Sequence, residues 1–381
     1  MMTKTTSHRI ATHVRLALIM MLLWSGAAAA DHTVVALTPL PRLEKLERGS
    51  VTVSGLSSGG FFAHQFHVAH SSLVKGAGIA AGGPYACAEG APLWLRFYPN
   101  ATLTYALTVC SHIWRAKYPM LAFWLPAAPD PQGSADTIRQ EQGRGTIDPP
   151  TNLVAARVWL FAGGNDAVVP PATVAAVKRV YELIGVPSAN IRLVDEAGAN
   201  HGLPIEEFPG AGTAPACGTL ASPFLIDCDY DAAKLMLAHL YPDGFRSEPA
   251  AGEDARLIRF DQTEFPGSTE PLSGMHREGY LHIPANCANG AAGSARCRLH
   301  VAFHGCQQSA ERIHDAFYRH GGYNRWAEAN AIVVLYPQVA AQAVNPEGCW
   351  DWWGYTGADY YRSAGKQMRA VKAMLDRLLG N

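Results

Sequence analysis

The stretch Gly55-Leu56-Ser57-Ser58-Gly59-Gly60 decides the fold of this chain. The β-branched residues 51–53 precede it, and Phe62, Phe66 and Ala69 recur after it at helical spacing. A glycine-rich turn between a strand and a helix matches the G-x-S-x-G nucleophile elbow, in which a serine lies on a strained turn above a sheet. An ordinary turn serine would not need both flanking elements. Ser57 is therefore a candidate nucleophile.

Apolar segments alternate with helical patterns along the rest of the chain. We expect strands at 76–81, 157–162, 190–194, 278–283, 298–303 and 331–336, and helices at 173–184, 231–240, 323–329 and 364–379. This alternation predicts an α/β fold with a mostly parallel central sheet and helices on both faces. No repeat or linker divides residues 31–381, so we expect a single domain. Residues 125–150 and 204–256 are rich in proline and polar residues, and we expect long surface excursions there.

The first thirty residues have the pattern of an export signal. Lys4, Arg9 and Arg15 form a positive region, residues 16–24 form a short apolar core, and four alanines follow at 27–30. A membrane anchor is the weaker alternative, because the apolar run falls short of the roughly 20 residues that span a bilayer. We expect cleavage near residue 31, export to the periplasm or the medium, and no membrane contact after cleavage.

Composition excludes some classes of protein. The chain has 381 residues, of which 48% are hydrophobic and 17% charged, so it has enough apolar material for a large core. Its net charge is -1, and loss of the three cations of the signal lowers it to about -4. Nucleic acid is not an expected partner, because polyanion binding needs a basic surface. The oligomeric state is not indicated by the sequence.

Eight cysteines lie in the mature chain, at positions 87, 110, 217, 228, 287, 297, 306 and 349. An even number in an exported protein favours disulfides. Proximity favours Cys217–Cys228 and Cys287–Cys297, which leaves Cys87–Cys110 and Cys306–Cys349 as one of several pairings still open. We expect no metal, since there is no C-x-x-C pair. His64, His67 and His70 share one helix face and could suggest a metal site. No nearby carboxylate or cysteine completes a ligand set, so we do not expect a metal there either.

A serine nucleophile needs a histidine base and an acid that orients the base. In α/β-hydrolases these residues follow the serine in the order acid, then histidine. Asp166 and His201 satisfy that order, and each follows a predicted strand, where open α/β sheets place their sites. Asp166 could instead be a helix N-cap. Asp195 and Glu196 are alternative acids.

One turn lies in an unusual place. Acyl transfer needs two donors for the developing oxyanion: the backbone N–H after the nucleophile, here Ser58, and one from a His-Gly turn that usually precedes the serine. In this chain the His-Gly turn, His304-Gly305-Cys306, follows the candidate histidine. Placing residues 298–379 before residues 51–201 restores the usual order. The sequence therefore predicts a circularly permuted α/β-hydrolase.

Further stretches belong to the same pattern. They are Gly82-Gly83-Pro84-Tyr85-Ala86-Cys87, Phe161-Ala162-Gly163-Gly164-Asn165-Asp166, Gly279-Tyr280-Leu281-His282-Ile283-Pro284, His304-Gly305-Cys306-Gln307-Gln308 and Gly348-Cys349-Trp350-Asp351-Trp352-Trp353. Together with the serine turn they resemble the poly(3-hydroxybutyrate) depolymerase family in its permuted form. The resemblance covers almost all of residues 45–381.

The resemblance implies roles for particular residues. It implies Ser57 as nucleophile, His201 as base, Asp166 as orienting acid, the backbone N–H groups of Ser58 and Cys306 as oxyanion donors, and a Cys306–Cys349 disulfide. Many exported members carry a separate substrate-binding domain, and we expect this chain to use an apolar surface instead. The substrate-binding candidates are Trp350, Trp352, Trp353 and Tyr355, with His304 beside them.

The leading hypothesis is a serine esterase that hydrolyses poly(3-hydroxybutyrate), related polyhydroxyalkanoates or their oligomers through an acyl-serine intermediate. No metal or organic cofactor is expected, because the protein itself supplies nucleophile, base and oxyanion donors. A feruloyl or acetyl esterase acting on plant-wall esters is the alternative enzyme. A non-catalytic polymer-binding protein on a hydrolase scaffold is the alternative from another class.

Overall fold

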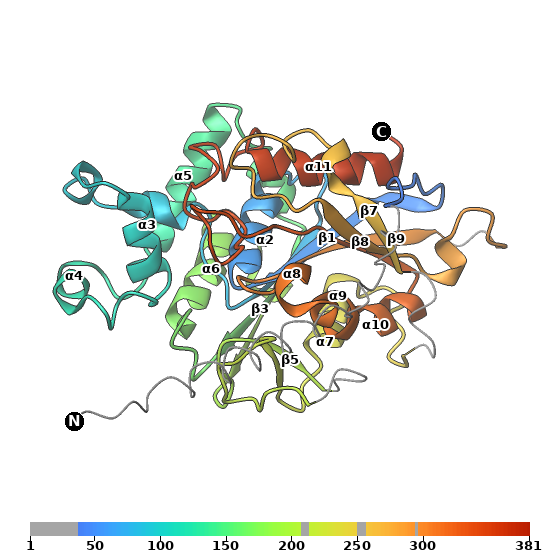
Figure 1. The fold of residues 1–381 in the computed structure, drawn as a ribbon, viewed down its shortest axis with the longest axis horizontal. Helices are drawn as coiled ribbons and strands as arrows, with labels where there is room; N and C mark the ends of the chain where they lie inside the picture. The colour runs from blue at the N-terminus through green and yellow to red at the C-terminus, as the bar shows by residue number, and fades with distance from the viewer. Residues whose placement is uncertain (1–36, 207–212, 250–256, 294–295) are drawn as a thin grey trace, which may run out of the picture. The chain divides into compact units, whose positions relative to one another are not determined.

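An eight-stranded sheet with the order β4-β3-β2-β1-β9-β10-β8-β7 organises the computed structural model of this chain (Figure 1). In that order the strands are Ile191–Glu196, Arg157–Gly163, Gly76–Ala80, Leu46–Leu56, Cys297–Phe303, Ile332–Tyr336, Glu278–His282 and Leu257–Asp261. The six strands from β4 to β10 are parallel, and β8 and β7 pair antiparallel at one edge. The predicted mostly parallel sheet is confirmed.

The structure describes residues 37–206, 213–249, 257–293 and 296–381. Residues Leu37–Asn381 form one compact unit. The expected export signal at 1–30 lies outside the described residues. In the described part of the chain, no helix is both long enough and apolar enough to cross a membrane.

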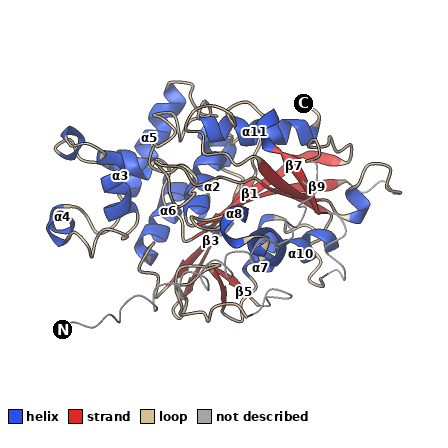
Figure 2. Ribbon diagram, viewed as in Figure 1, coloured by secondary structure: helices blue, strands red, loops and turns tan. Residues whose placement is uncertain are grey.

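Helices cover both faces of the sheet, as predicted (Figures 1 and 2). One face carries α2 (Ser58–Ala69), α5 (Pro131–Gly143), α6 (Pro171–Leu183) and α11 (Lys366–Leu379), and the other carries α7 (Ala232–Leu240) and α10 (Tyr323–Ala329). Four short helices are α3 (Ala101–Tyr105), α4 (Pro119–Trp124), α8 (Ala310–Ile313) and α9 (Ala316–His320). Single turns are η1 (Cys87–Gly90), η2 (Leu95–Phe97), η3 (Ala106–Cys110), η4 (Pro150–Leu153), η5 (Ser188–Asn190), η7 (Gln262–Glu264) and η8 (Ala285–Cys287).

The strand order explains the unusual place of the His-Gly turn. β1, which leads into Ser57, lies between β2 and β9, and Gly55 is opposite Phe303 in the parallel register. Two turns that are far apart in sequence therefore leave the same edge of the sheet side by side. The chain belongs to the α/β-hydrolase fold with its connections permuted, as the order of the motifs predicts.

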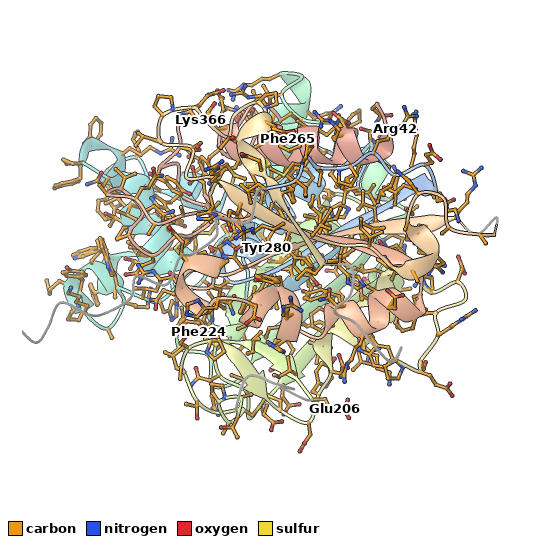
Figure 3. All side chains as sticks on the ribbon, turned by 45° about the vertical axis from the view of Figure 1, so that its right-hand side comes forward. Arg42, Glu206, Phe224, Phe265, Tyr280 and Lys366 are labelled. Atoms are coloured by element: carbon orange, nitrogen blue, oxygen red, sulfur yellow. A yellow bond between two sulfur atoms is a disulfide. The ribbon has the colours of Figure 1, made fainter. Side chains whose placement is uncertain are left out.

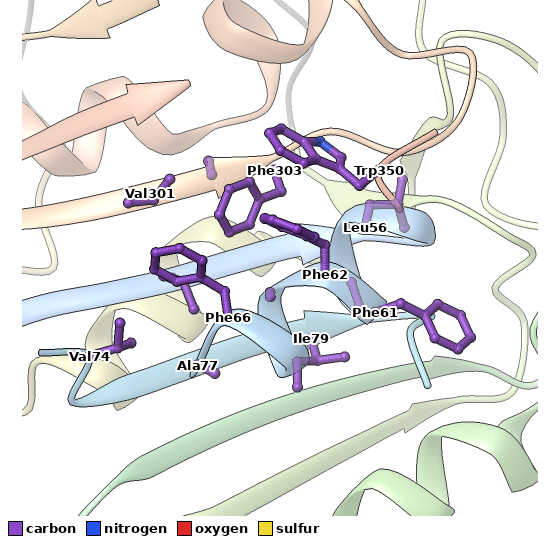
Figure 4. Close-up of a cluster of buried hydrophobic side chains, with 14 of the residues drawn as sticks. Leu56, Phe61, Phe62, Phe66, Val74, Ala77, Ile79, Val301, Phe303 and Trp350 are labelled. Atoms are coloured by element: carbon purple, nitrogen blue, oxygen red, sulfur yellow. The ribbon is translucent and has the colours of Figure 1, made fainter. Parts of the chain in front are cut away.

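Aromatic side chains fill the core beneath these two turns (Figure 4). Phe62 of α2 packs against Phe303 at a ring-centroid distance of 5.0 Å and against Trp350 at 4.6 Å. All three side chains are buried. Each aromatic residue buried in this way stabilises the fold by about 2 kcal/mol, so the core also holds the helix after Ser57 against β9.

The two expected excursions are more ordered than the sequence pattern indicates. Residues 131–143 form helix α5, because the Asp130 carboxylate accepts hydrogen bonds from the N–H groups of Gln132 and Gly133 at its start. Near the end of α5, Glu141 is buried and ion-paired with Arg362. Within 204–256, β5 (Leu203–Ile205) and β6 (Leu225–Asp227) form a small parallel sheet before α7.

Four disulfides join the eight cysteines. They are Cys87–Cys110, Cys217–Cys228, Cys287–Cys297 and Cys306–Cys349. The pairs expected from proximity are confirmed, and the pair implied by the resemblance is present as well. Disulfides of this number are typical of proteins that mature in an oxidising compartment.

Candidate active site

Ser57 lies on the sharp turn between β1 and α2, and its backbone has a positive φ of 56°, which is uncommon for a residue other than glycine. Its N–H donates a hydrogen bond to the carbonyl oxygen of Ala80 at 2.9 Å. A Cβ atom at Gly59 would come within 2.4 Å of the carbonyl oxygens of Phe303 and His304. Glycine is therefore required there, because it lets the serine turn approach the His-Gly turn closely.

Asp166 and His201 form a hydrogen-bonded pair. Oδ2 of Asp166 lies 2.7 Å from Nδ1 of His201, and both side chains are buried. Oδ1 of Asp166 accepts hydrogen bonds from the N–H groups of Val168 and Val169, each at 2.8 Å. One oxygen thus orders the turn after β3 while the other faces the imidazole. The carboxylate of Asp166 thus accepts backbone hydrogen bonds, as an N-cap residue does, and also contacts the histidine.

The alternative acids occupy other positions. Asp195 is exposed on β4, and Glu196 ends that strand. Among the hydrogen bonds and ion pairs of the described residues, neither carboxylate contacts His201.

Asn200 holds the loop that carries His201. Its Oδ1 accepts a hydrogen bond from the N–H of His201 at 2.8 Å, and its Nδ2 donates to the carbonyl oxygen of Gly218 at 3.1 Å. Gly218 follows Cys217, whose disulfide with Cys228 closes that loop. The sequence analysis did not identify Asn200, because its contact with Gly218 depends on how two loops pack together.

Ser57 and His201 line one cavity of about 740 Å³. The walls are mostly apolar and come from several segments of the chain. They include Leu103, Leu107, Ile113 and Trp114, then Val168, then Leu220, Ala221, Ser222 and Phe224, the turn 305–308, and Val344, Trp352 and Trp353. A cavity of this size and apolar character fits a small apolar ligand or a segment of polymer.

The described residues include no hydrogen bond between Oγ of Ser57 and the imidazole of His201. The two side chains share the cavity without a hydrogen bond between them. Contacts between a nucleophile and its base are often long in structures without substrate and shorten when substrate binds.

The turn after β9 leaves one N–H group unpaired. Gly305 N–H donates to Oε1 of Gln308 at 2.7 Å, and Gln307 N–H donates to the carbonyl oxygen of Glu347 at 2.7 Å. In the described part of the chain, the N–H groups of Cys306 and Ser58 donate to no protein acceptor. Cys306 lines the same cavity as Ser57, and Ser58 is the first residue of α2. Unpaired donors at a helix N-terminus and an adjacent turn can bind an oxyanion.

Gln308 connects this turn to the loop at 222–224. Its Nε2 donates to the carbonyl oxygen of Pro223 at 2.7 Å, while its Oε1 accepts from Gly305. The side chain is buried, and Phe224, labelled in Figure 3, follows Pro223 in the cavity wall. Gln308 was part of a motif in the sequence, but its role in joining two loops depends on the fold.

The segment 345–350 also contacts the His-Gly turn at 304–306. The Cys306–Cys349 disulfide links them covalently. The N–H of Trp350 lies 3.3 Å from Oγ of Ser58, so the segment also contacts the first turn of α2. These contacts fix the His-Gly turn relative to the serine turn.

The expected substrate-binding residues separate into two groups. Trp352 and Trp353 line the cavity. Trp350 and His304 have 0% exposure and do not line it, so the structure places them away from the position expected of substrate-binding residues. Trp350 packs on the core beneath α2. Tyr355 is also outside the cavity lining, and its hydroxyl donates to the carbonyl oxygen of Cys349 at 2.7 Å.

His304 supports the backbone instead. Its Nδ1 lies 2.7 Å from the carbonyl oxygen of Gly305, and its Nε2 accepts a hydrogen bond from Val339 N–H at 3.2 Å. Burial lowers the pKa of His304 to about 4, although the contact with Gly305 opposes the shift. A neutral imidazole with one donor and one acceptor satisfies both contacts.

Asp351 shapes the loop that carries the two cavity tryptophans. Its buried carboxylate accepts hydrogen bonds from four consecutive N–H groups, those of Trp353, Gly354, Tyr355 and Thr356. Burial raises the pKa of Asp351, and these hydrogen bonds oppose the increase. Sequence reasoning missed this residue, since an aspartate between tryptophans does not indicate where its carboxylate points.

The histidines of α2 belong to the core. Nδ1 of His64 lies 3.1 Å from the carbonyl oxygen of Gly83, and Nδ1 of His67 lies 2.8 Å from the hydroxyl of Tyr181. Burial lowers the pKa of His64 to about 4 and that of His67 to about 3. These neutral side chains contribute packing and hydrogen bonds to the core beneath the serine turn.

Two curated proteins are similar to this chain over most of its length. A poly(3-hydroxybutyrate) depolymerase from Delftia acidovorans is 38% identical over 358 residues, which are 93% of this chain and 65% of that protein. The chain thus spans about two thirds of that relative. A polyhydroxybutyrate depolymerase from Talaromyces funiculosus is 32% identical over 357 residues, which are 91% of this chain and 94% of the relative. No protein-family model matches the chain.

A solved structure agrees with these sequence matches. The crystal structure of PHB depolymerase from Penicillium funiculosum has a TM-score of 0.76 and 30% identity, and the match covers 90% of this chain and 99% of that one. A second structure, of a PHB depolymerase variant complexed with an R3HB trimer, matches equally well. With this identity over nearly the whole of the fungal relative, the chain belongs to the polyhydroxybutyrate depolymerase family.

Proposed function

We propose that this protein hydrolyses the ester bonds of poly(3-hydroxybutyrate), of related polyhydroxyalkanoates and of their oligomers. The observation that carries the proposal is the Asp166–His201 hydrogen bond in a cavity that Ser57 also lines. Membership of the depolymerase family and a relative complexed with an R3HB trimer support the choice of substrate.

In the first half of the reaction, Oγ of Ser57 attacks the ester carbonyl carbon and Nε2 of His201 takes the hydroxyl proton. Asp166 keeps the Nδ1 proton of His201 in place and stabilises the imidazolium that forms. The tetrahedral intermediate then collapses to an acyl-serine, and the leaving alkoxide takes the proton from His201. In the second half, water attacks the acyl-serine with His201 again as base, and the hydroxyacid end is released.

The backbone N–H groups of Ser58 and Cys306 are proposed as the oxyanion donors. Their support is geometric: both N–H groups are unpaired among the described residues, and the two turns that carry them leave adjacent parallel strands. The N-terminal end of α2 adds a favourable partial positive charge beside the developing oxyanion. Gln308 and the Cys306–Cys349 disulfide are proposed to position the second donor.

The cavity walls favour a methyl-bearing polyester chain. Trp352, Trp353 and the leucines that line the cavity offer apolar area, and the ester carbonyls need only the few donors near Ser57. Feruloyl or acetyl esterase activity and non-catalytic polymer binding are not favoured by the family to which the chain belongs. Export to the periplasm or the medium remains the proposed location, and the four disulfides support it.

Active-site labelling combined with a soluble substrate tests this proposal. A fluorophosphonate should modify Ser57, and the labelled residue can be identified by peptide mass spectrometry. The parent protein should hydrolyse a soluble 3-hydroxybutyrate oligomer, and Ser57→Ala should neither react with the label nor hydrolyse the oligomer. Labelling of another residue, or hydrolysis of feruloyl esters without action on the oligomer, would overturn the proposal.

A further inference from the structure

Residues 92–126 form an extension, here named the aromatic arm, that lies away from the central sheet at the left of Figure 1. It contains η2, α3, η3 and α4. The arm has two tips, residues 93–98 and residues 118–124, on either side of α3. The Cys87–Cys110 disulfide anchors its base.

The tips expose large apolar side chains. Phe97, Phe123 and Met120 have exposed fractions of 81%, 79% and 75%, and α4 buries none of its residues. Of the fourteen large apolar side chains that are exposed in the described residues, nine lie on the arm. Such a concentration marks an interaction surface, since exposed apolar residues scattered singly are the ordinary case.

Hydrogen bonds from two arginine side chains to backbone carbonyl oxygens hold the tips in this exposed position. The guanidinium group of Arg115 donates to the carbonyl oxygens of Thr108, Ala122, Leu125 and Pro126, and so closes the segment that carries α4. Arg96 donates to the carbonyl oxygens of Glu89 and Ala91 at the other tip. These hydrogen bonds order the two segments, so the exposed apolar side chains have defined positions. Their exposure to water is unfavourable for the free energy of the isolated protein.

The charge of the arm limits the kinds of partner that it can bind. Residues 90–129 contain no aspartate or glutamate, but they contain Arg96, Arg115 and Lys117. The indoles of Trp94 and Trp124 and the tyrosine hydroxyls add further hydrogen-bond donors. A surface with donors and apolar area but no carboxylates matches a partner that offers apolar area and acceptor oxygens.

The inner side of the arm continues into the catalytic cavity. Leu103, Leu107, Ile113 and Trp114 line the cavity that contains Ser57 and His201. Trp114 also packs against Tyr118 of the second tip at a ring-centroid distance of 5.3 Å, so this tip is continuous with the cavity wall. A polyester fits both positions, because its repeating units are apolar and its ester carbonyls accept hydrogen bonds.

We propose that the aromatic arm docks the enzyme on the surface of solid polyester. Segments of the polymer then enter the catalytic cavity while the enzyme stays adsorbed. This inference rests on the proposed function. It assigns adsorption to the outer tips of the arm and ester cleavage to the cavity, so the two properties can be changed separately.

The test compares two sets of exposed residues. The arm variant is Phe97→Ser/Met120→Ser/Phe123→Ser, and the control with the same number of substitutions is Val154→Ser/Leu193→Ser/Leu272→Ser, whose side chains are exposed elsewhere. Adsorption to poly(3-hydroxybutyrate) particles is measured in a Ser57→Ala background, so that hydrolysis does not erode the surface. Hydrolysis of a soluble aryl ester is measured with Ser57 intact.

The arm variant should lose adsorption affinity by about tenfold or more, while the control stays within about twofold. Both should hydrolyse the soluble ester at the parent rate. Adsorption of the parent should survive high salt, because the polymer carries no charge.

Equal adsorption of the arm variant and the control would overturn the inference. It would also be overturned by salt-sensitive binding to phosphatidylglycerol vesicles without polymer adsorption, which would assign the arm to a lipid surface. A dimer in sedimentation velocity that only the arm variant dissociates would assign the arm to a second copy of the chain. Failure of the proposed function is distinguishable: the parent would then adsorb to polymer but hydrolyse neither the soluble oligomer nor the particles.

Discussion

Asp166 and His201 lie 35 residues apart in sequence, and Oδ2 of the first is 2.7 Å from Nδ1 of the second. Asp166 accepts hydrogen bonds at both oxygens, since Oδ1 binds the N–H groups of Val168 and Val169. The carboxylate is thus fixed by the turn that follows β3 before it contacts the imidazole. Its orientation is built into the fold.

Asp166→Asn should lower kcat by about 10³- to 10⁴-fold. If the amide oxygen keeps the contacts with Val168 and Val169, its NH₂ group must face His201, which favours the wrong imidazole tautomer. Thermal unfolding should change little, and KM for a soluble ester should stay close to the parent value. A loss of less than about tenfold would show that another acid orients His201; Asp195→Asn is the control variant and should retain activity.

Gln308→Ala should lower kcat by about 10- to 100-fold with little change in KM, because the turn bearing the N–H of Cys306 would lose its contacts. Gln308→Glu gives a sharper test. A neutral carboxyl can accept from Gly305 and donate to Pro223, but an ionised carboxylate cannot donate. The activity of Gln308→Glu relative to the parent should therefore rise as the pH falls. A pH-independent ratio would contradict the positioning role of this side chain.

Removal of two different disulfides should separate site positioning from general stability. Cys306→Ser/Cys349→Ser and Cys287→Ser/Cys297→Ser should each lower the free energy of unfolding by about 2 to 4 kcal/mol. Only the first should lower kcat for a soluble ester, because only that bond joins the turn beside Ser57 to the tryptophan-bearing loop. Equal kcat values for the two variants, measured well below both melting temperatures, would contradict this expectation.

Acid should destabilise the protein through its buried histidines. Burial lowers the pKa of five of them to about 3 or 4, and these are His64, His67, His70, His300 and His304. In the unfolded chain their pKa values return to about 6.5, so between pH 6.5 and 4 the unfolded state takes up protons that the folded state does not. The free energy of unfolding should therefore fall as the pH is lowered through that range.

His70→Phe provides the check on this pH dependence. His70 is buried against Phe66, and its pKa is lowered to about 4, chiefly by burial, with the charge of Asp148 opposing. Replacing it with phenylalanine removes one proton taken up on unfolding. The melting temperature of the variant should fall less steeply than that of the parent between pH 7 and pH 5. Parallel curves would contradict the assignment of His70 as a contributor.

The order of motifs was enough to predict the fold and to identify Asp166 and His201 as partners. Strand-ending turns in a parallel sheet all leave at one edge, so their residues can be brought together from the sequence pattern alone. The adjacency of β1 and β9 confirms the inference drawn from the displaced His-Gly turn. Asn200, Gln308 and Asp351 could not be predicted in the same way, because their contacts join loops whose paths have no sequence periodicity.

Aromatic composition was the least informative signal. Trp350 and Trp352 lie two positions apart, but one packs in the core and the other lines the cavity. In a segment without regular structure, no periodicity indicates which side chain faces inward. The aromatic arm shows the converse: residues 93–124 have the composition of a core, and many of them are exposed.

The most direct test of the proposed activity is release of 3-hydroxybutyrate and its oligomers from amorphous poly(3-hydroxybutyrate) particles, with Ser57→Ala as the control. We expect release by the parent and none above background by the variant, because Ser57 is the proposed nucleophile for polymer as well as for soluble esters. Equal release by both proteins would contradict the role of Ser57. No release by either, while the parent still hydrolyses a small aryl ester, would contradict the polyester substrate.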